Sequence, residues 1–155
     1  MLLALTAVLA AAATAAADHA LNVVTHDNGN FDVMVDSEIW MSSTDVMARF
    51  DGAEVRASNG TLGLAYNKTY DGADGYGKFT GRVFGWVSGS NELITTVKFY
   101  AAENFAAFTT FWPKGASGTA SGDKQSTVSS FPSWNVSRSV PKTCLGTPCQ
   151  IRCRS

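Results

Sequence analysis

The chain has little of what most catalytic and metal sites are built from, because its 155 residues include only two histidines. A Ser-His-Asp triad requires a histidine, and His26, which stands beside Asp27 just before an Asn-Gly-Asn turn, fits an exposed loop better than a catalytic base. His19 would suit an N-terminal copper site only after cleavage behind Asp18, a poor residue beside a signal-peptidase site. We therefore predict no catalytic residue, no metal site and no cofactor.

The body of the chain also lacks cysteine. Cys144, Cys149 and Cys153 all fall in the last dozen residues, so the body has no disulfide framework and depends on its apolar core. These three residues are candidates for disulfides, and their odd number leaves one thiol for a partner chain or for a cysteine that this chain lacks. A zinc site in the same cluster would need a fourth ligand, and the sequence offers none nearby.

An excess of basic residues is absent as well. Twelve lysines and arginines stand against thirteen aspartates and glutamates, and the basic tail from Arg138 onward contains no acid, which leaves the body mildly acidic. A nucleic-acid binder needs a basic face that neutralises several phosphates. We therefore expect no nucleic-acid partner.

Sustained helical periodicity is missing too, and short segments with a period of two alternate with Gly, Asn, Asp and Ser. Residues 31–36 and 38–41 are predicted to form one hairpin. A second hairpin, with arms at 46–50 and 54–57, is predicted from the Asp-Gly pair between them, which two-residue type I′ turns prefer. The clearest unit is a three-stranded meander at residues 78–87, 92–101 and 105–112.

The middle strand of this meander has apolar residues on both faces, which predicts a place near the centre of its sheet, with Val97 and Phe99 pointing between two sheets. Gly81 and Gly85 interrupt the strand before it, and we expect them to relieve crowding beside that strand's own aromatic residues or to mark a bulge. One further strand, interrupted by a proline, is predicted at 128–136. Strands about ten residues apart without crossover helices predict an antiparallel β-sandwich, jelly-roll-like or supersandwich-like.

The opening of the chain is an uncharged apolar run, Met1 to Ala17, that ends on small residues and has the pattern of a secretory signal peptide. We therefore divide the chain into a signal-peptide helix at 1–17, a β-sandwich domain at 18–138 and a basic, cysteine-containing tail at 139–155. The mature protein is expected to be secreted or extracellular, with no membrane association after signal removal. Three Asn-x-Ser/Thr sequons agree with this route and predict glycosylation at Asn59, Asn67 and Asn135.

The segments FDVMVDSEIWMSS, GKFTGRVFGWVSG, TTVKFYAAENFAAFTTFWPKGASGT and VSSFPSW follow one another between Phe31 and Trp134. Their spacing and aromatic placement resemble the N-terminal β-sandwich region of large secreted glycoside hydrolases of the α-galactosidase and α-glucosidase type. In such proteins the sandwich precedes a barrel that carries the catalytic acids. This chain departs from that pattern after Val140, so the resemblance implies either a stand-alone sandwich or a truncated accessory domain.

Paired carboxylates for glycoside hydrolysis are hard to find in the sequence. A glycosidase needs two carboxylates ~5–10 Å apart that face one cleft. The four glutamates are Glu38, Glu54, Glu92 and Glu103, and none lies in mid-strand with an identifiable partner. The stretch 71–77 has two aspartates that could bind calcium, although tight surface turns use the same residues.

Aromatic side chains are the best candidates for a function based on contact, because sugar rings stack on them. Tyr70 and Tyr76 flank the Gly-rich stretch and should be exposed, and Trp86 and Trp112 complete the predicted carbohydrate-binding set. For each tryptophan, ordinary core packing is the alternative. The sequence thus predicts a secreted, non-catalytic β-sandwich module that binds or accompanies carbohydrate; the alternatives are a truncated accessory domain of a glycoside hydrolase and a small β-sandwich glycanase.

Overall fold

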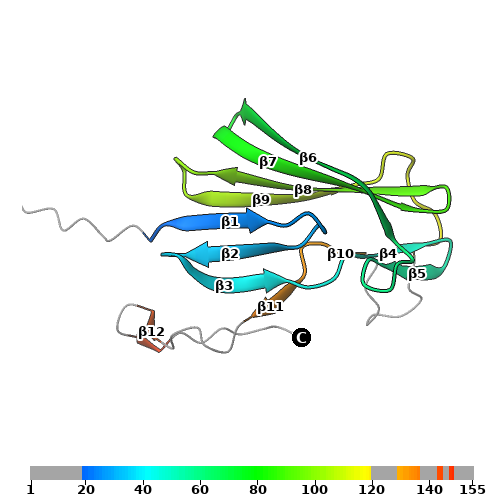
Figure 1. The fold of residues 1–155 in the computed structure, drawn as a ribbon, viewed down its shortest axis with the longest axis horizontal. Coiled ribbons are helices and arrows are strands. Elements are labelled where there is room, and N and C mark those ends of the chain that lie inside the picture. The colour runs from blue at the N-terminus through cyan, green and yellow to red at the C-terminus, as the bar shows by residue number, and fades with distance from the viewer. Residues whose placement is uncertain (1–18, 120–128, 137–142, 145–146, 149–155) are drawn as a thin grey trace, which may run out of the picture.

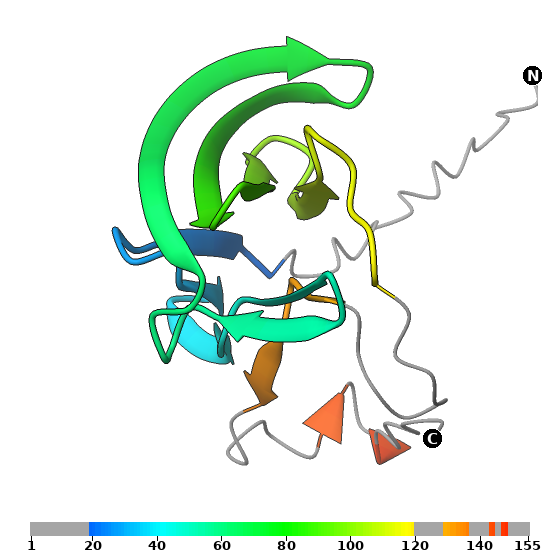
Figure 2. The same cartoon turned by 90° about the vertical axis from the view of Figure 1, so that its right-hand side faces the viewer.

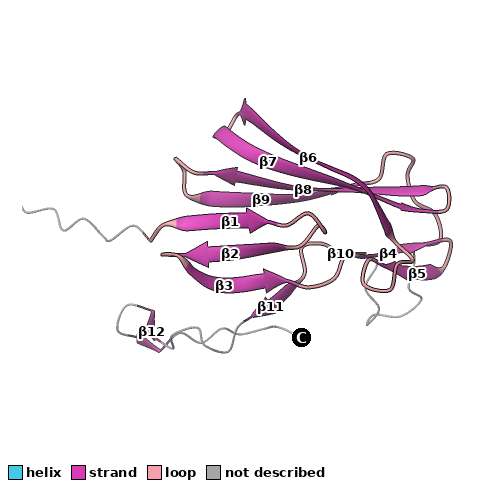
Figure 3. Cartoon of the chain, viewed as in Figure 1, coloured by secondary structure: helices cyan, strands magenta, loops and turns pink. Residues whose placement is uncertain are grey.

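A computed structural model describes residues 19–119, 129–136, 143–144 and 147–148 of the chain. Within these ranges the protein consists of strands and loops, as Figure 3 shows, which confirms the predicted all-β class. No helix of the described part has the length and hydropathy of a membrane span. The predicted signal peptide lies outside the described residues.

The first sheet has the order β1-β2-β3-β11, and its neighbouring strands are all antiparallel. Its strands are β1 (Leu21–Thr25), β2 (Phe31–Val35), β3 (Glu38–Ser43) and β11 (Trp134–Val136). Alternation along β2 buries Phe31 and Val33 and leaves Asp32 between them on the other face. This part of the chain forms the hairpin that the sequence predicts, turning at Asp36 and Ser37, both with positive φ.

The second sheet has the order β10-β4-β5 and contains β10 (Ser129–Ser130), β4 (Met47–Phe50) and β5 (Ala53–Arg56). The β4–β5 hairpin turns at Asp51-Gly52, where φ is 50° and 80°, so the predicted Asp-Gly turn is confirmed. Two further short strands, β12 (Thr143–Cys144) and β13 (Thr147–Pro148), pair with each other.

The large sheet is a four-stranded antiparallel meander in the order β6-β7-β8-β9. Its strands are β6 (Gly63–Asp74), β7 (Gly77–Ser88), β8 (Asn91–Tyr100) and β9 (Phe105–Phe111). The last three are the strands of the predicted meander, and β8 lies in the interior of the sheet as expected.

These sheets form two layers, and in Figure 1 the large sheet lies over the first and second sheets, which are side by side beneath it. Two apolar clusters fill the space between the layers. One joins the large sheet to the second sheet through Ala48, Phe50, Phe84, Trp86 and Leu93, and the other joins it to the first sheet through Phe31, Val33 and Val97. Phe131, between β10 and β11, packs against both clusters.

Three expectations about the strands need correction. Residues 128–136 do not form one strand, because β10 and β11 belong to different sheets on either side of Phe131 and Pro132. The stretch 71–77 is not one Gly-rich turn, because β6 runs to Asp74 and only Gly75 and Tyr76 lie between β6 and β7. Phe99 lies on the core side of β8 with Val97, but it is only partly buried.

Candidate functional site

One face of the large sheet packs on the core, and the other is directed away from the first and second sheets. On β8, Leu93, Thr95 and Val97 are buried against the core, so the residues between them point to the opposite side, here called the outer face. Strand register carries this alternation to the neighbouring strands. The outer face carries Tyr66, Lys68, Tyr70 and Asp74 of β6, Phe79 and Val83 of β7, Ile94, Thr96, Lys98 and Tyr100 of β8, and Phe105, Thr109 and Phe111 of β9.

The outer face is concave. Figure 2 shows β6 and β7 arching over β8 and β9, with the first and second sheets on the far side. The ring of Tyr76, at the tip of the β6–β7 hairpin, lies 6.2 Å from that of Tyr100 and 5.9 Å from that of Phe105, centroid to centroid. The hairpin tip is therefore bent over the outer face and covers its far end.

Two tyrosines of the edge strand β6 lie over glycines of β7. Tyr66 pairs with Gly85, and Tyr70 pairs with Gly81. A Cβ atom built on Gly81 would lie 2.7 Å from the Tyr70 ring, and one built on Gly85 would lie closer still to the Tyr66 ring. Each ring thus occupies the space that a side chain on β7 would fill. Both tyrosines remain 37% exposed.

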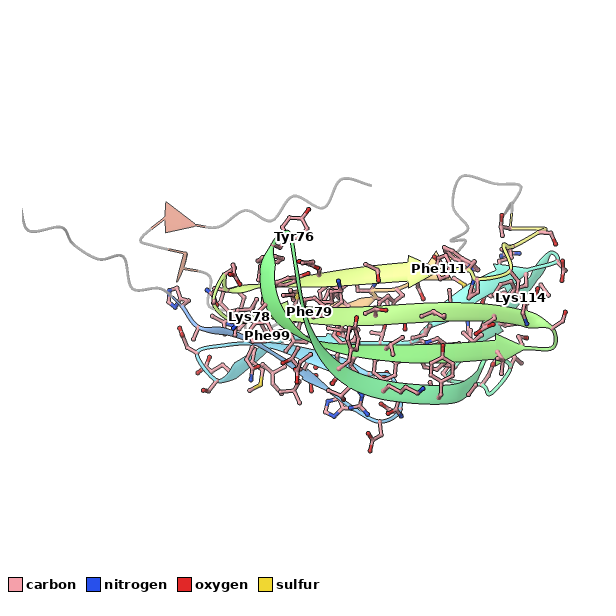
Figure 4. The ribbon with its side chains drawn as sticks, turned by 90° about the horizontal axis from the view of Figure 1, so that it is seen from above. Tyr76, Lys78, Phe79, Phe99, Phe111 and Lys114 are labelled. Atoms are coloured by element: carbon pink, nitrogen blue, oxygen red, sulfur yellow. The ribbon has the colours of Figure 1, made fainter. Side chains whose placement is uncertain are left out.

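At the hairpin end, further aromatic rings form a continuous cluster. Tyr100 stacks on Phe105 with 4.4 Å between ring centroids, and Phe79 contacts both Tyr70 and Tyr100. Tyr76 closes the cluster and is 71% exposed, as its position at the hairpin tip in Figure 4 indicates. A hollow of about 390 Å³ near this end of the sheet is lined mainly by residues of the opposite side, Asp71, Lys78, Thr80 and Phe99, so it is not part of the outer face.

A polar group at the centre of this cluster holds the hairpin tip in place. The Asp74 carboxylate accepts hydrogen bonds from the Tyr100 hydroxyl at 2.7 Å, from Lys98 Nζ at 2.9 Å and from the Tyr76 amide at 3.0 Å. These bonds, the one from Tyr100 first, lower the pKa of Asp74, and the same carboxylate raises the pKa of Lys98. Asp74 is therefore an ionised anchor and unsuited to act as a general acid near neutral pH.

The predicted carbohydrate-binding residues divide into two groups. Tyr70 and Tyr76 come together on the outer face. Trp86 is only 2% exposed and its indole N–H donates to Thr95 Oγ1 inside the core, so it offers no surface for stacking. Trp112 packs against the same core cluster and is partly buried.

Tyr66 completes the outer face, although it is not among the site residues that the sequence predicts. A signal was present, because two tyrosines four residues apart precede two glycines four residues apart, which places each ring over a glycine in an antiparallel hairpin. The expectation that Gly81 and Gly85 relieve crowding from aromatic residues of their own strand is thereby corrected. The crowding comes from the strand beside them.

The four glutamates, all of them in the described ranges, do not combine with one another into an identifiable catalytic pair. Glu38 lies in the first sheet and Glu54 in the second, where it bonds Arg56. Glu92 lies near the start of β8 and Glu103 in the turn that follows its end, so roughly 26 Å of strand separates them. This separation is far beyond the ~5–10 Å that a glycosidase requires.

A calcium site at 71–77 does not fit the geometry either. Asp71 and Asp74 are three residues apart on one strand, so they point to opposite faces. Asp71 accepts a hydrogen bond from Thr80 and Asp74 is held by Lys98 and Tyr100. His26 bonds Asp32 at 2.8 Å, which places it in an exposed pair away from the outer face.

The sequons occupy three different environments. Asn59 lies exposed in a loop, where its side-chain oxygen accepts bonds from the backbone and hydroxyl of Thr61. Asn67 is on β6, where its side-chain NH2 group donates a hydrogen bond to the Asp27 carbonyl and its side-chain oxygen accepts one from Arg82. Asn135 is exposed on β11. Glycosylation at all three stays a prediction, as do disulfides of the cysteines, since Cys149 and Cys153 lie outside the described residues and the side chain of Cys144 is not described.

Similarity to known proteins does not assign a role to the outer face. The resemblance to the sandwich region of glycoside hydrolases stays a prediction. No model of a protein family, no curated protein and no solved structure matches the chain.

Proposed function

We propose that the outer face of the large sheet binds carbohydrate without cleaving it. Tyr66 and Tyr70 would provide stacking surfaces, with Tyr76 at the hairpin tip as a third contact. The observation that carries this proposal is the placement of both β6 rings over glycines, which fixes two exposed aromatic rings on a concave surface. They are four residues apart on one strand, or roughly 13 Å, a spacing suited to a chain of sugars.

Other uses of this surface agree less well with its chemistry. Exposed rings that only complete a core would be covered by other side chains, whereas Tyr66 and Tyr70 are each more than one-third exposed. A nucleic acid would need several unpaired cations along its path. Among the residues that the structure describes, the outer face has one lysine outside an ion pair. The Asp74 carboxylate is held by Tyr100 and Lys98 and has a lowered pKa, so it is unsuited to serve as the general acid of hydrolysis, which favours binding.

Retention on immobilised polysaccharides tests the proposal. Tyr66→Ala and Tyr70→Ala should each bind about tenfold more weakly, because one well-packed aromatic contact contributes about 1.4 kcal/mol. Ile39→Ala is the matched control, since Ile39 is an exposed apolar residue of the first sheet. Wild-type binding by both tyrosine variants, or equal loss in Ile39→Ala, would contradict the proposed site.

A further inference from the structure

The charges of the outer face are unevenly paired. Asp74 Oδ2 lies 2.9 Å from Lys98 Nζ. Glu92 is near the other end of β8, and its pairing with Val87 of β7 places it on the outer face as well. Its Oε2 atom lies 3.8 Å from Lys114 Nζ. Each of these two carboxylates therefore has its own lysine. A third carboxylate, that of Glu103, lies against Gly77 at the hairpin end, about 20 Å along β6 from Lys68, so it is remote from a ligand that contacts Lys68.

Lys68 is the cation left over. It lies on β6 two residues from both Tyr66 and Tyr70, so it points to the same side as the two rings. It is exposed, and it forms no ion pair with any carboxylate in the described ranges. Its ammonium group lies 5.9 Å from the centroid of the Tyr66 ring. The positive charge thus lies beside the Tyr66 ring, within the range of a cation–π contact.

From this arrangement we infer that the outer face selects anionic sugar chains, those that carry carboxylate or sulfate groups, over neutral ones. The inference rests on the proposed function. A sugar chain lying across Tyr66 and Tyr70 passes over Lys68, where a uronate or sulfate gains an ion pair and a neutral ring gains none. For an exposed pair this preference amounts to about twofold to fivefold per charge contacted, and it falls as salt screens it.

Matched ligands isolate the effect of charge. The full-length protein is titrated with polygalacturonate and with the same polymer fully methyl-esterified, and in a second arm with a sulfated galactan and its desulfated form. The acidic member of at least one pair should bind about twofold to fivefold or more tightly at low salt, and the two arms distinguish carboxylate from sulfate recognition.

Variants of two lysines make the assignment specific. Lys68→Gln should abolish the preference, so that the charged and the neutral member of a pair bind with equal affinity. Lys78→Gln is the control. Lys78 is also exposed, but it pairs with Ala73, whose neighbour Asp74 lies on the outer face, so Lys78 points to the opposite side of the hairpin. It should keep the preference.

The outcomes separate this inference from the proposed function. Equal binding of charged and neutral polymers, with loss in Tyr66→Ala, would overturn the selectivity and keep the binding face. A preference that survives Lys68→Gln would also overturn it. Absence of binding to all four polymers would overturn the selectivity, while retention of another polysaccharide that depends on Tyr66 would still support the face.

Discussion

Gly81 and Gly85 are costly residues for the interior of β7, because a glycine within a strand destabilises it by about 0.5–1 kcal/mol relative to alanine. Here each position is covered by a tyrosine of the neighbouring strand. Packing of a ring over a cross-strand glycine restores part of that stability. At the scale of single residues, the glycines therefore serve to position Tyr66 and Tyr70.

Gly85→Ala should consequently weaken polysaccharide binding about as much as Tyr66→Ala does, about tenfold. The added methyl group takes the space of the Tyr66 ring, which is exposed and can swing away, so the free energy of unfolding should change by less than about 1 kcal/mol. Binding and thermal unfolding are measured together. Gly75→Ala is the control, because a Cβ there meets nothing within 4 Å; unaltered binding by Gly85→Ala would refute this role of the glycine.

At the scale of elements, the β6–β7 hairpin carries most of the candidate site, and its tip is held by Asp74, Lys98 and Tyr100. The pKa of Asp74 is lowered from 3.8, so its stabilising contribution is complete above that pH and is lost as the pH falls through the lower pKa of the folded state. The pKa of Lys98 is raised from 10.5, so its contribution is complete below that pH and is lost as the pH rises through the higher folded pKa.

The hairpin tip should therefore stay in place between about pH 4 and pH 10. Side-chain NMR signals of Tyr76 should be constant across this range and shift in more acidic solution, as protonation of Asp74 releases Lys98. Asp74→Asn should remove the acid transition and shift the Tyr76 signals at neutral pH. Asp71→Asn, which alters only a surface bond to Thr80, should behave as wild type. A Tyr76 signal that Asp74→Asn leaves unmoved would show that the anchor lies elsewhere.

The sequence predicts some of these elements better than others. Strands β7, β8 and β9 and the two hairpins with Asp-Ser and Asp-Gly turns are predictable because one face is buried and the turn residues suit positive φ. Strand β6 is not predictable in this way, because it is an edge strand that is exposed on both sides for most of its length. Burial therefore imposes no alternation of polar and apolar residues on its sequence. The candidate site lies largely on that strand, and for this reason Tyr66 and Lys68 emerge only from the register with β7.

At the scale of the whole molecule, three sheets are joined by two apolar clusters that share Phe131. The large sheet supplies one side of both clusters, so the first and second sheets need it as their common partner. The outer face is thus the solvent-facing side of the large sheet, whose other side packs against both apolar clusters. A ligand there contacts a surface whose shape is set by the core beneath it.

Phe31 is the strongest test of this arrangement, because it is 1% exposed and its ring contacts those of Phe108, Phe131 and Trp134. Phe31→Ala removes buried surface and leaves a cavity, which should lower the free energy of unfolding by about 3–5 kcal/mol. A domain of this size has about 5–15 kcal/mol to lose, so urea unfolding should shift to much lower concentration.

Two further variants keep this prediction decidable. Phe31→Leu retains part of the buried surface and should lose clearly less stability than Phe31→Ala, which allows a measurement even if the alanine variant does not fold. Phe111→Ala, at a ring that is 59% exposed on the outer face, should change stability by less than about 1 kcal/mol.

Because Phe131 links the two apolar clusters, the fluorescence of Trp86 in one cluster and of Trp134 in the other should report a single unfolding transition. Separate transitions, or a loss below about 1 kcal/mol in Phe31→Ala, would show that the first sheet is not an integral part of the sandwich.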